Sequence, residues 1–342
     1  MIRVGVVGYG YWGPNLVRNF ADAEGSVLAA VCDTRADRLA LVERRYPGVK
    51  ALSSWRELVA DPGVDLVAIS TPVSTHFDIA LAALEAGKHV LVEKPMAMHV
   101  DQCSRLIDEA AKRHLVLMVD HTFVYTPSVR KMHELVHDGS LGEIYYYDSV
   151  RINLGLFQHD VNVIWDLAVH DLAIMDHVLP ERPVAVSATG ISHIPGGHEN
   201  IAYLTMFFAS KMIAHLHVNW LAPVKVRSTL LGGSKKMIVW DDLELVEKVK
   251  VYDRGITVNT SHDNLYQLLV GYRSGDMWAP RLDTTEALGV EIRHLIDCIE
   301  HGKRPITDGE AGLEVVRILE NATRSMREQG RPVELTEKVA LA

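Results

Sequence analysis

Residues 2–13 read IRVGVVGYGYWG, an apolar run followed at once by glycines at three spaced positions. The apolar run is typical of a buried parallel strand, and the residues that come after the last glycine have helical spacing. In such a strand–turn–helix unit the first glycine permits a tight turn, the second lets the backbone approach a pyrophosphate, and the third lets helix and strand pack closely. The stretch therefore predicts a dinucleotide-binding fold with Gly8, Gly10 and Gly13 at the phosphates.

An acidic residue, Asp33, ends the second predicted strand, which covers Val27–Cys32. It follows Gly13 by about 20 residues, the place from which a carboxylate binds the ribose hydroxyls of NAD and repels the 2′-phosphate of NADP. NAD is therefore the favoured cofactor. Arg35 and Arg38 follow closely and are able to accommodate a 2′-phosphate, so NADP remains the less favoured alternative.

The order of the predicted elements changes after residue 120. Up to there, short apolar runs alternate with amphipathic stretches, which indicates a parallel sheet with right-handed crossovers. Beyond it, strand-like runs follow one another with short turns, which favours a mostly antiparallel sheet. These runs are Glu143–Ile152, Val184–Ser192, Ile201–Phe208, Met212–Leu221, Val226–Leu231 and Met237–Trp240.

We therefore predict an α/β protein of two domains, because 342 residues exceed one comfortable hydrophobic core. An N-terminal Rossmann dinucleotide-binding domain is expected at residues 1–121. An α+β domain with a large, mostly antiparallel open sheet is expected at residues 122–342. Residues 254–282 have the weakest periodicity and are expected to form a long loop region.

Composition narrows the class of protein further. The net charge is -9, with acidic and basic residues interleaved, which argues against nucleic acid as a partner. The three cysteines, Cys32, Cys103 and Cys298, lie far apart in the sequence and are expected to be reduced core residues. No apolar run reaches the ~20 residues that a membrane span needs. We expect a cytoplasmic protein without a leader peptide, a membrane segment or a membrane partner.

Three further motifs bring a resemblance into view. Ser70–His76 reads STPVSTH and Glu93–Pro95 reads EKP, each at the end of a predicted strand, and Trp165–Asp171 reads WDLAVHD, a D-x-x-x-H element. With the glycine turn, these motifs resemble the Gfo/Idh/MocA family of oxidoreductases over essentially the whole chain. Residues 151–170 look closest to the branch that acts on nucleotide-linked amino sugars, such as the UDP-N-acetylglucosamine 3-dehydrogenases.

The resemblance implies an NAD-dependent oxidoreductase that transfers a hydride between nicotinamide and a secondary alcohol of a sugar. A nucleotide-linked amino sugar reacting at its 3-hydroxyl is the favoured substrate. One alternative is a dehydrogenase of inositol or of a free sugar. Others are a non-catalytic protein that senses NAD or a sugar on the same fold, and an enzyme that keeps NAD bound as a transient redox relay.

His170 is implied to be the proton acceptor and donor, because a histidine already titrates near neutral pH. Asp166 lies four residues earlier, on the same face of a helix, and is expected to contact the substrate or to orient the ring. Asn162 lies on that face as well. Spacing alone favours the alternative, a carboxylate in the first helical turn and an interior histidine without a catalytic role, and the EKP motif reverses this preference.

Lys94 follows a strand on the side where open parallel sheets bind ligands. A lysine beside the nicotinamide can hydrogen-bond the reacting oxygen and stabilise its developing negative charge. Its pKa would fall if it were desolvated, which would also make it a candidate proton donor. The alternative is a solvated lysine at a strand end, although Pro95 argues for a fixed backbone there.

The remaining candidates rest on position and resemblance. Cofactor contacts are expected from residues at the ends of the strands and in the glycine turn: Tyr11, Trp12, Thr71, Pro72, His76, Glu93, Lys94 and His121. Substrate hydroxyls or a diphosphate are expected to meet Arg151, Asn153 and Lys225, with a surface or interface role as the equal alternative.

No metal site is expected. His170 and His177 lack the i, i+4 spacing of a zinc-binding helix, and His215 with His217 is a spacing that more often lines a polar surface. The large sheet of the second domain would leave a broad exposed face in a monomer, so a homodimer or homotetramer formed through that sheet is expected.

Overall fold

The structure is a computed structural model that describes residues 1–155, 161–253, 255–258 and 270–335. The chain forms two compact units, and each unit is made of two separate segments of the chain. The first combines residues 1–126 with 285–320, and the second combines residues 127–284 with 321–342. The sequence predicts a single boundary after residue 121, whereas in the structure residues 285–320 also belong to the first unit.

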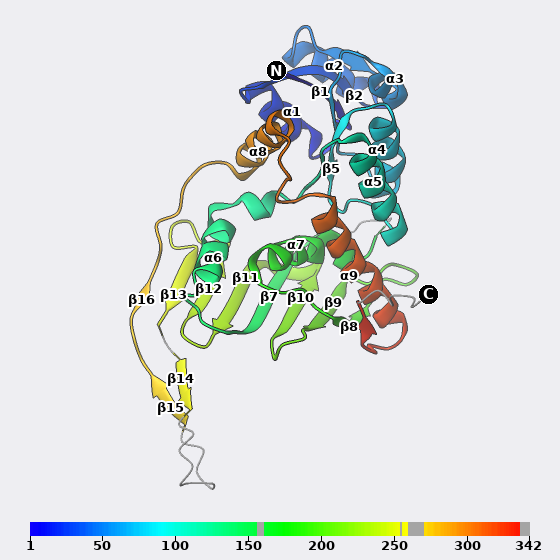
Figure 1. The fold of residues 1–342 in the computed structure, drawn as a ribbon. Coiled ribbons are helices and arrows are strands. Elements are labelled where there is room, and N and C mark those ends of the chain that lie inside the picture. Colours follow the sequence, from blue (N-terminus) through cyan, green and yellow to red (C-terminus); the bar gives the residue numbers. More distant parts are fainter. Residues whose placement is uncertain (156–160, 254, 259–269, 336–342) are drawn as a thin grey trace. The chain divides into compact units, whose positions relative to one another are not determined.

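The first unit is built on a six-stranded parallel sheet with the strand order β3-β2-β1-β4-β5-β6 (Figure 1). Strand β4 is fully buried, and β1 and β5 are buried except at Arg3, His89 and Glu93, as a parallel sheet covered on both faces requires. The strands are β1 (Ile2–Val7), β2 (Ser26–Cys32), β3 (Lys50–Leu52), β4 (Leu66–Ile69), β5 (His89–Glu93) and β6 (Leu117–Asp120).

Helices pack around this sheet, and four of them form two pairs, α1 with α8 and α4 with α5 (Figure 1). The helix α8 comes from far along the chain and supplies the returning segment of the first unit. The helices are α1 (Gly13–Asp22), α2 (Ala36–Arg45), α3 (Trp55–Ala60), α4 (His76–Glu85), α5 (Val100–Arg113) and α8 (Ala287–His301), with short 3-10 turns η1 (Val73–Thr75) and η2 (Thr122–Tyr125).

The second unit is built on a nine-stranded sheet with the order β16-β13-β12-β11-β7-β10-β9-β8-β17. Only β7 and β10 pair in parallel, and the other neighbours are antiparallel. The strands are β7 (Ile144–Leu154), β8 (Ala185–Ile191), β9 (Ile201–Phe207), β10 (Ile213–Asn219), β11 (Leu221–Gly233), β12 (Met237–Asp241), β13 (Val249–Tyr252), β16 (Met277–Trp278) and β17 (Val333–Glu334). The predicted fold class is confirmed.

Helices α6 (Pro127–His137) and α7 (Val169–Val178) lie on one face of this sheet (Figure 1). A π-helical turn, η3 (Ile164–Ala168), leads directly into α7. The helix α9 (Gly309–Arg327) begins in the first unit and ends in the second.

The region expected to be a long loop differs in its described part. Residues 255–258 and 270–273 form a separate hairpin, β14 (Gly255–Val258) with β15 (Val270–Arg273), and β16 joins the large sheet. Position 254 and residues 259–269 lie outside the described residues.

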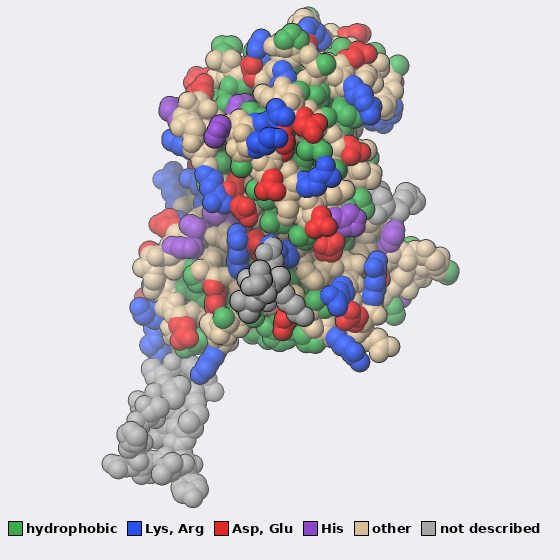
Figure 2. Space-filling view, turned by 45° about the vertical axis from the view of Figure 1, so that its right-hand side comes forward, with side chains coloured by type: hydrophobic (Ala, Val, Ile, Leu, Met, Phe, Trp, Pro, Cys, Tyr) green, Lys and Arg blue, Asp and Glu red, His purple; other side chains and the backbone are tan. Residues whose placement is uncertain are grey.

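The distribution of surface charge and the state of the cysteines match what the composition predicts. On the face shown in Figure 2, basic and acidic side chains are interspersed, without a continuous area of one sign. Cys32, Cys103 and Cys298 are free and buried. In the described ranges, no helix combines the length and apolarity needed to cross a membrane.

Candidate functional site

The glycine turn of the first unit cannot hold side chains at two of its three glycines. Gly8 has φ +97°, and a Cβ there would lie 2.4 Å from the carbonyl oxygen of Ser70. A Cβ on Gly13 would lie 2.0 Å from the carbonyl oxygen of Gly8. By contrast, a Cβ on Gly10 would meet nothing within 4 Å, so this backbone faces open space. That is the arrangement in which a pyrophosphate can approach the main chain.

Helix α1 begins at the end of this turn without a side-chain cap. Its N-cap residue is Trp12, which makes no capping hydrogen bond, and a proline stands in the first turn. Uncapped backbone N–H groups and the positive end of the helix dipole form a binding site for phosphate. The turn and the helix start together fit the diphosphate of a dinucleotide.

Asp33, at the end of β2, is held in place by the same turn. Its carboxylate accepts hydrogen bonds from the backbone N–H of Tyr9 at 2.8 Å and of Arg35 at 2.9 Å. Burial alone would raise the pKa of Asp33, but these two hydrogen bonds and the Arg35 side chain lower it overall. The group is therefore an oriented carboxylate, as the binding of ribose hydroxyls requires. The Arg35 side chain, half exposed, lies 3.4 Å from it.

The loops that follow β4 and β5 are joined by His76. Its Nε2 lies 2.8 Å from the carbonyl oxygen of Thr71, and its Nδ1 lies 2.9 Å from that of Pro95. His76 is buried, so its ring contacts the two loops from the interior of the unit. The hydroxyl of Thr71 contacts that of Thr75 at 2.7 Å, and the Pro72 carbonyl also accepts from Thr75.

Glu93 is the last residue of β5 and Lys94 follows it, and the Lys94–Pro95 peptide bond is cis. The backbone N–H of Lys94 donates to the Glu93 carboxyl at 3.0 Å. Both side chains are partly buried. Lys94 thus lies at the carboxyl edge of the parallel sheet, as the sequence predicted.

The two aromatic residues of the glycine turn behave differently. Tyr11 is 92% exposed, whereas the indole Nε1 of Trp12 donates to Asp120, the last residue of β6, at 2.8 Å. His121 follows and is buried, and burial lowers its pKa to about 4. Tyr11 is thus available to cover a ligand, while Trp12 fixes the turn to the sheet.

In the second unit, Asp166 lies in the π-helical turn and His170 in the first turn of α7. The sequence predicted one regular helix through both residues, and the structure differs by this local change of helix type. Single π turns inside helices occur frequently at functional sites. Both side chains are partly buried, and the indole Nε1 of Trp220 donates to Asp166 at 3.0 Å.

Asn162 precedes the π turn, and its side chain contacts Glu199 at 3.2 Å and the backbone N–H of Trp165 at 3.4 Å. Asn162 therefore anchors the start of the element that carries Asp166 and His170. Asn153, near the end of β7, is partly buried, and Lys225 on β11 is exposed.

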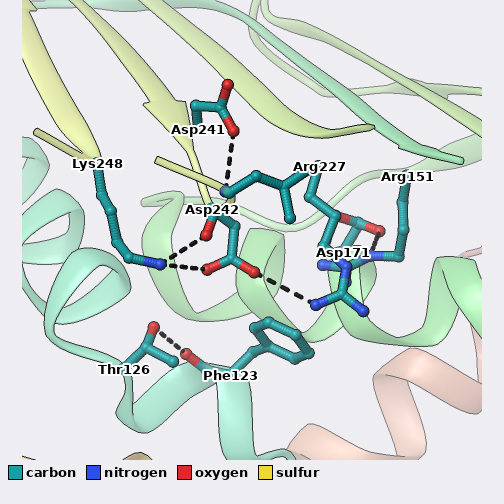
Figure 3. Close-up of polar contacts among 9 residues, drawn as sticks. Phe123, Thr126, Arg151, Asp171, Arg227, Asp241, Asp242 and Lys248 are labelled. Atoms are coloured by element: carbon teal, nitrogen blue, oxygen red, sulfur yellow. Dashed lines mark hydrogen bonds and ion pairs between the residues drawn. The ribbon is translucent and has the colours of Figure 1, made fainter. Parts of the chain in front are cut away.

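Arg151 is buried and paired with an acidic residue that the sequence reasoning did not single out (Figure 3). Its Nε lies 2.6 Å and its Nη2 3.2 Å from the carboxylate of Asp171, which also accepts from Ser149 at 2.8 Å. Both ionic side chains are 3% exposed or less. Arg151 thereby joins β7 to α7 at Asp171, the residue that directly follows His170.

A second set of charges extends from this pair (Figure 3). Arg227 on β11 contacts Asp242 at 3.3 Å, and Lys248 contacts the same carboxylate at 3.4 Å. Burial lowers the pKa of Arg227, and the positive charge of Arg151 lowers it further. The two arginines are therefore held close together by carboxylates within the second unit.

Three residues of these networks were missed by the sequence reasoning. Asp171 lies beside His170 in the WDLAVHD motif and gave no separate signal. Trp220 is distant in sequence from Asp166. Glu291 of α8 is fully buried and occupies an apolar stripe with Leu288 and Ile292, a position where a charged residue is itself a signal. Among the residues with described side chains, no cluster of His, Cys, Asp or Glu has a metal-binding arrangement.

Comparisons with known proteins match two consecutive parts of the chain. Residues 2–121 match the family model described as "Oxidoreductase family, NAD-binding Rossmann fold", and residues 133–335 match "Oxidoreductase family, C-terminal alpha/beta domain", both of the Gfo/Idh/MocA group. The UDP-N-acetylglucosamine 3-dehydrogenase of Acidithiobacillus ferrooxidans is 29% identical over 92% of this chain and 94% of its own length.

One further relative and one solved structure span nearly the whole chain. The myo-inositol 2-dehydrogenase of Thermotoga maritima is 24% identical over 99% of this chain and 100% of its own length. A solved structure of the UDP-N-acetylglucosamine 3-dehydrogenase from A. ferrooxidans superimposes with a TM-score of 0.80, covering 96% of this chain and 98% of that one at 27% identity. With both of its domains matched, the chain belongs to the Gfo/Idh/MocA family of oxidoreductases and carries that family's NAD-binding Rossmann fold.

Proposed function

We propose that the protein is an NAD-dependent dehydrogenase that acts on a secondary alcohol of a nucleotide-linked amino sugar, at the 3-hydroxyl. The observation that carries the redox part is the open backbone at Gly10 beside the uncapped start of α1, with the oriented Asp33 carboxylate on the next strand. Similarity to the UDP-N-acetylglucosamine 3-dehydrogenase over nine-tenths of both chains supports the substrate class.

Oxidation of an alcohol removes a proton from oxygen and a hydride from carbon. Bound NAD+ supplies the hydride acceptor. His170 takes the hydroxyl proton, while Asp166, oriented by the Trp220 indole, stabilises the charged ring or binds a neighbouring hydroxyl. Lys94 hydrogen-bonds the reacting oxygen and stabilises its negative charge as it develops. The products are a ketone, NADH and a proton.

The other substrate contacts are proposed from the second unit. Asn153, Asn162 and Lys225 are assigned to sugar hydroxyls or to the diphosphate of the nucleotide. Arg151 has Asp171 as its ion-pair partner, so we assign it the role of fixing the segment that carries His170 rather than that of a direct ligand.

The direct test is to incubate the purified protein with NAD+ and follow NADH absorbance. UDP-N-acetylglucosamine should be turned over in preference to myo-inositol and scyllo-inositol. The free inositols are the second candidate substrates, because a myo-inositol 2-dehydrogenase matches the full chain. Turnover of inositol without turnover of any nucleotide sugar would overturn the substrate proposal and leave the dehydrogenase proposal standing.

Substitution of Lys94 distinguishes the proposed enzyme from a non-catalytic sensor with the same fold. Lys94→Ala should abolish NADH formation and weaken NADH binding by no more than one lost contact near the nicotinamide, since the phosphate turn is untouched. A sensor would keep its biological output in this variant. If the protein instead retains NAD as an internal redox relay, NAD should copurify with the protein and no NADH should be released.

NAD rather than NADP is proposed as the cofactor. Asp33 presents a carboxylate whose pKa is lowered, and a 2′-phosphate beside it would be repelled. Arg35 is the nearby cation that could compensate. Asp33→Ala should weaken NAD binding and bring the affinities for NADH and NADPH together, while Arg35→Ala should leave the preference for NADH unchanged.

We propose that the sheet of the second unit forms the contact between subunits of a dimer or tetramer. Large apolar side chains are exposed on one face of the neighbouring strands β9 and β10: Tyr203, Phe207 and Ile213 are 36–45% exposed. Tyr203 also stacks on His217 with ring centroids 4.4 Å apart. Light scattering should give a multiple of the 38.1 kDa chain mass, and Tyr203→Glu should reduce it.

A further inference from the structure

Three carboxyl groups lie together inside the first unit, and none of them takes part in the proposed chemistry. Glu93 and Asp120 are paired residues on the neighbouring strands β5 and β6, so their side chains share one face of the sheet. Glu291 comes from α8, which packs against η2 directly after Asp120. Glu291 is fully buried, and its carboxyl faces Asp120 and Thr122.

Two side-chain donors beside this cluster point to Asp120, and the backbone N–H of Lys94 donates to Glu93. The Trp12 indole N–H donates to one of its oxygens at 2.8 Å, and the Thr122 hydroxyl donates to the other. In the described part of the protein, neither carboxyl oxygen of Glu291 has a hydrogen-bond partner of ordinary geometry. A buried carboxylate without donors is strongly disfavoured, whereas a protonated carboxyl brings an O–H donor of its own.

The pKa shifts of the cluster agree with this uneven placement of hydrogen-bond donors. Burial, followed by the negative charge of Asp120, holds the pKa of Glu291 well above its usual value. The same two causes raise the pKa of Glu93, while the positive charge of Lys94 acts in the opposite direction. Three adjacent carboxyls, of which Asp120 and Glu291 are buried and Glu93 is partly buried, cannot all be ionised, so protons remain in the cluster.

We propose that Glu291 is a positioning residue that keeps a proton and donates it as a hydrogen bond to Asp120, which in turn holds Trp12 and the phosphate turn in place. Asp120 is then the single anion of the cluster. It accepts from Trp12 and Thr122, and its remaining lone pairs accept from the protonated Glu291 and Glu93. The cofactor-binding turn is thereby supported by a residue from the far end of the chain.

This inference rests on NAD binding by the first unit and is independent of the sugar. The test is therefore NADH affinity, measured by fluorescence titration without any sugar substrate. Glu291→Gln keeps a neutral N–H donor and should bind NADH within about twofold of wild type. Glu291→Leu removes the donor and should raise Kd about tenfold, because a hydrogen bond to a charged group is lost. Glu300→Gln, on the exposed face of the same helix, is the matched control.

Two further measurements separate positioning from simple packing. Trp12→Phe should raise Kd as Glu291→Leu does, and the double variant should be no worse than either single one, because both break the same chain of hydrogen bonds. Infrared absorption of protonated carboxyl groups should decrease in Glu291→Gln and stay unchanged in Glu300→Gln.

Equal affinities for the Gln and Leu variants would overturn the proposal, and so would an unchanged infrared absorption in Glu291→Gln. If the Leu variant fails to fold, the infrared comparison of wild type with Glu291→Gln decides alone. Failure to oxidise any sugar would count against the proposed function and leave this result untouched.

Discussion

Replacing Asp171 by asparagine should destabilise the second unit far more than loss of an ordinary ion pair. The substitution preserves size and removes the charge that faces Arg151 at 2.6 and 3.2 Å. Both partners are 3% exposed or less, so solvent cannot replace the lost charge. Removing one partner of a buried pair costs about 3–5 kcal/mol, because the other charge is left uncompensated.

The matched control is Asp176→Asn. Asp176 lies on the same helix and pairs with Arg182 at 2.8 Å, but that arginine side chain is 50% exposed. Its loss should cost about 0–1 kcal/mol. At about 2–4 °C per kcal/mol for a unit of this size, Asp171→Asn should lower Tm by roughly 6–20 °C, and the control by a few degrees at most.

Thermal and urea unfolding, followed by tryptophan fluorescence, measure the difference. The reasoning is refuted if the two variants lose similar stability. A double variant, Arg151→Met with Asp171→Leu, gives a second check. It should recover much of the loss, since apolar pairs of similar volume often replace buried ion pairs without cost.

The remaining predictions concern the cofactor turn, the π turn and the effect of pH. Gly13→Ala should lower both the thermal stability and the NADH affinity, because its Cβ would collide with the Gly8 carbonyl, whereas Gly10→Ala should leave Tm unchanged and weaken NADH binding alone; calorimetric scans with and without NADH distinguish them. Trp220→Phe removes the indole donor of Asp166 and should reduce kcat about tenfold without changing NADH affinity, as steady-state kinetics and titration can establish. Because folding raises the pKa of Glu291, the folded protein holds more protons there than the unfolded chain does, so this group lowers the free energy of unfolding as pH rises above about 4.3 and up to the raised pKa. Urea unfolding at several pH values should therefore show a shallower decline for Glu291→Gln than for wild type, and parallel curves would contradict the assignment.

The parts of the fold predicted from the sequence are those with strong local signals. The glycine turn, the buried parallel strands and the change to antiparallel strands after residue 120 each follow from patterns within a few residues. The edge strand β3 (Lys50–Leu52) was missed because three residues carry too little periodicity. The hairpin β14–β15 lies in the segment where apolar periodicity was weakest.

The site was predictable only residue by residue. Lys94 at the end of β5 and Asp33 at the end of β2 follow from strand ends, which local patterns reveal. The partners of Arg151 and Trp12 could not be found in this way, since Asp171 and Asp120 meet them through tertiary packing. The π turn at Ile164–Ala168 shifts the expected helical register for a similar reason.

The bridge made by His76 has a consequence for the two loops that it joins. Both ring nitrogens face carbonyl oxygens, yet a neutral imidazole carries one N–H, and burial lowers the pKa that would allow a second. The loop with Thr71 and the loop with Pro95 therefore compete for a single proton. When that proton moves from one nitrogen to the other, the hydrogen bond moves from one loop to the other. The tautomer of the His76 ring therefore decides which of the two loops is hydrogen-bonded at this edge of the sheet.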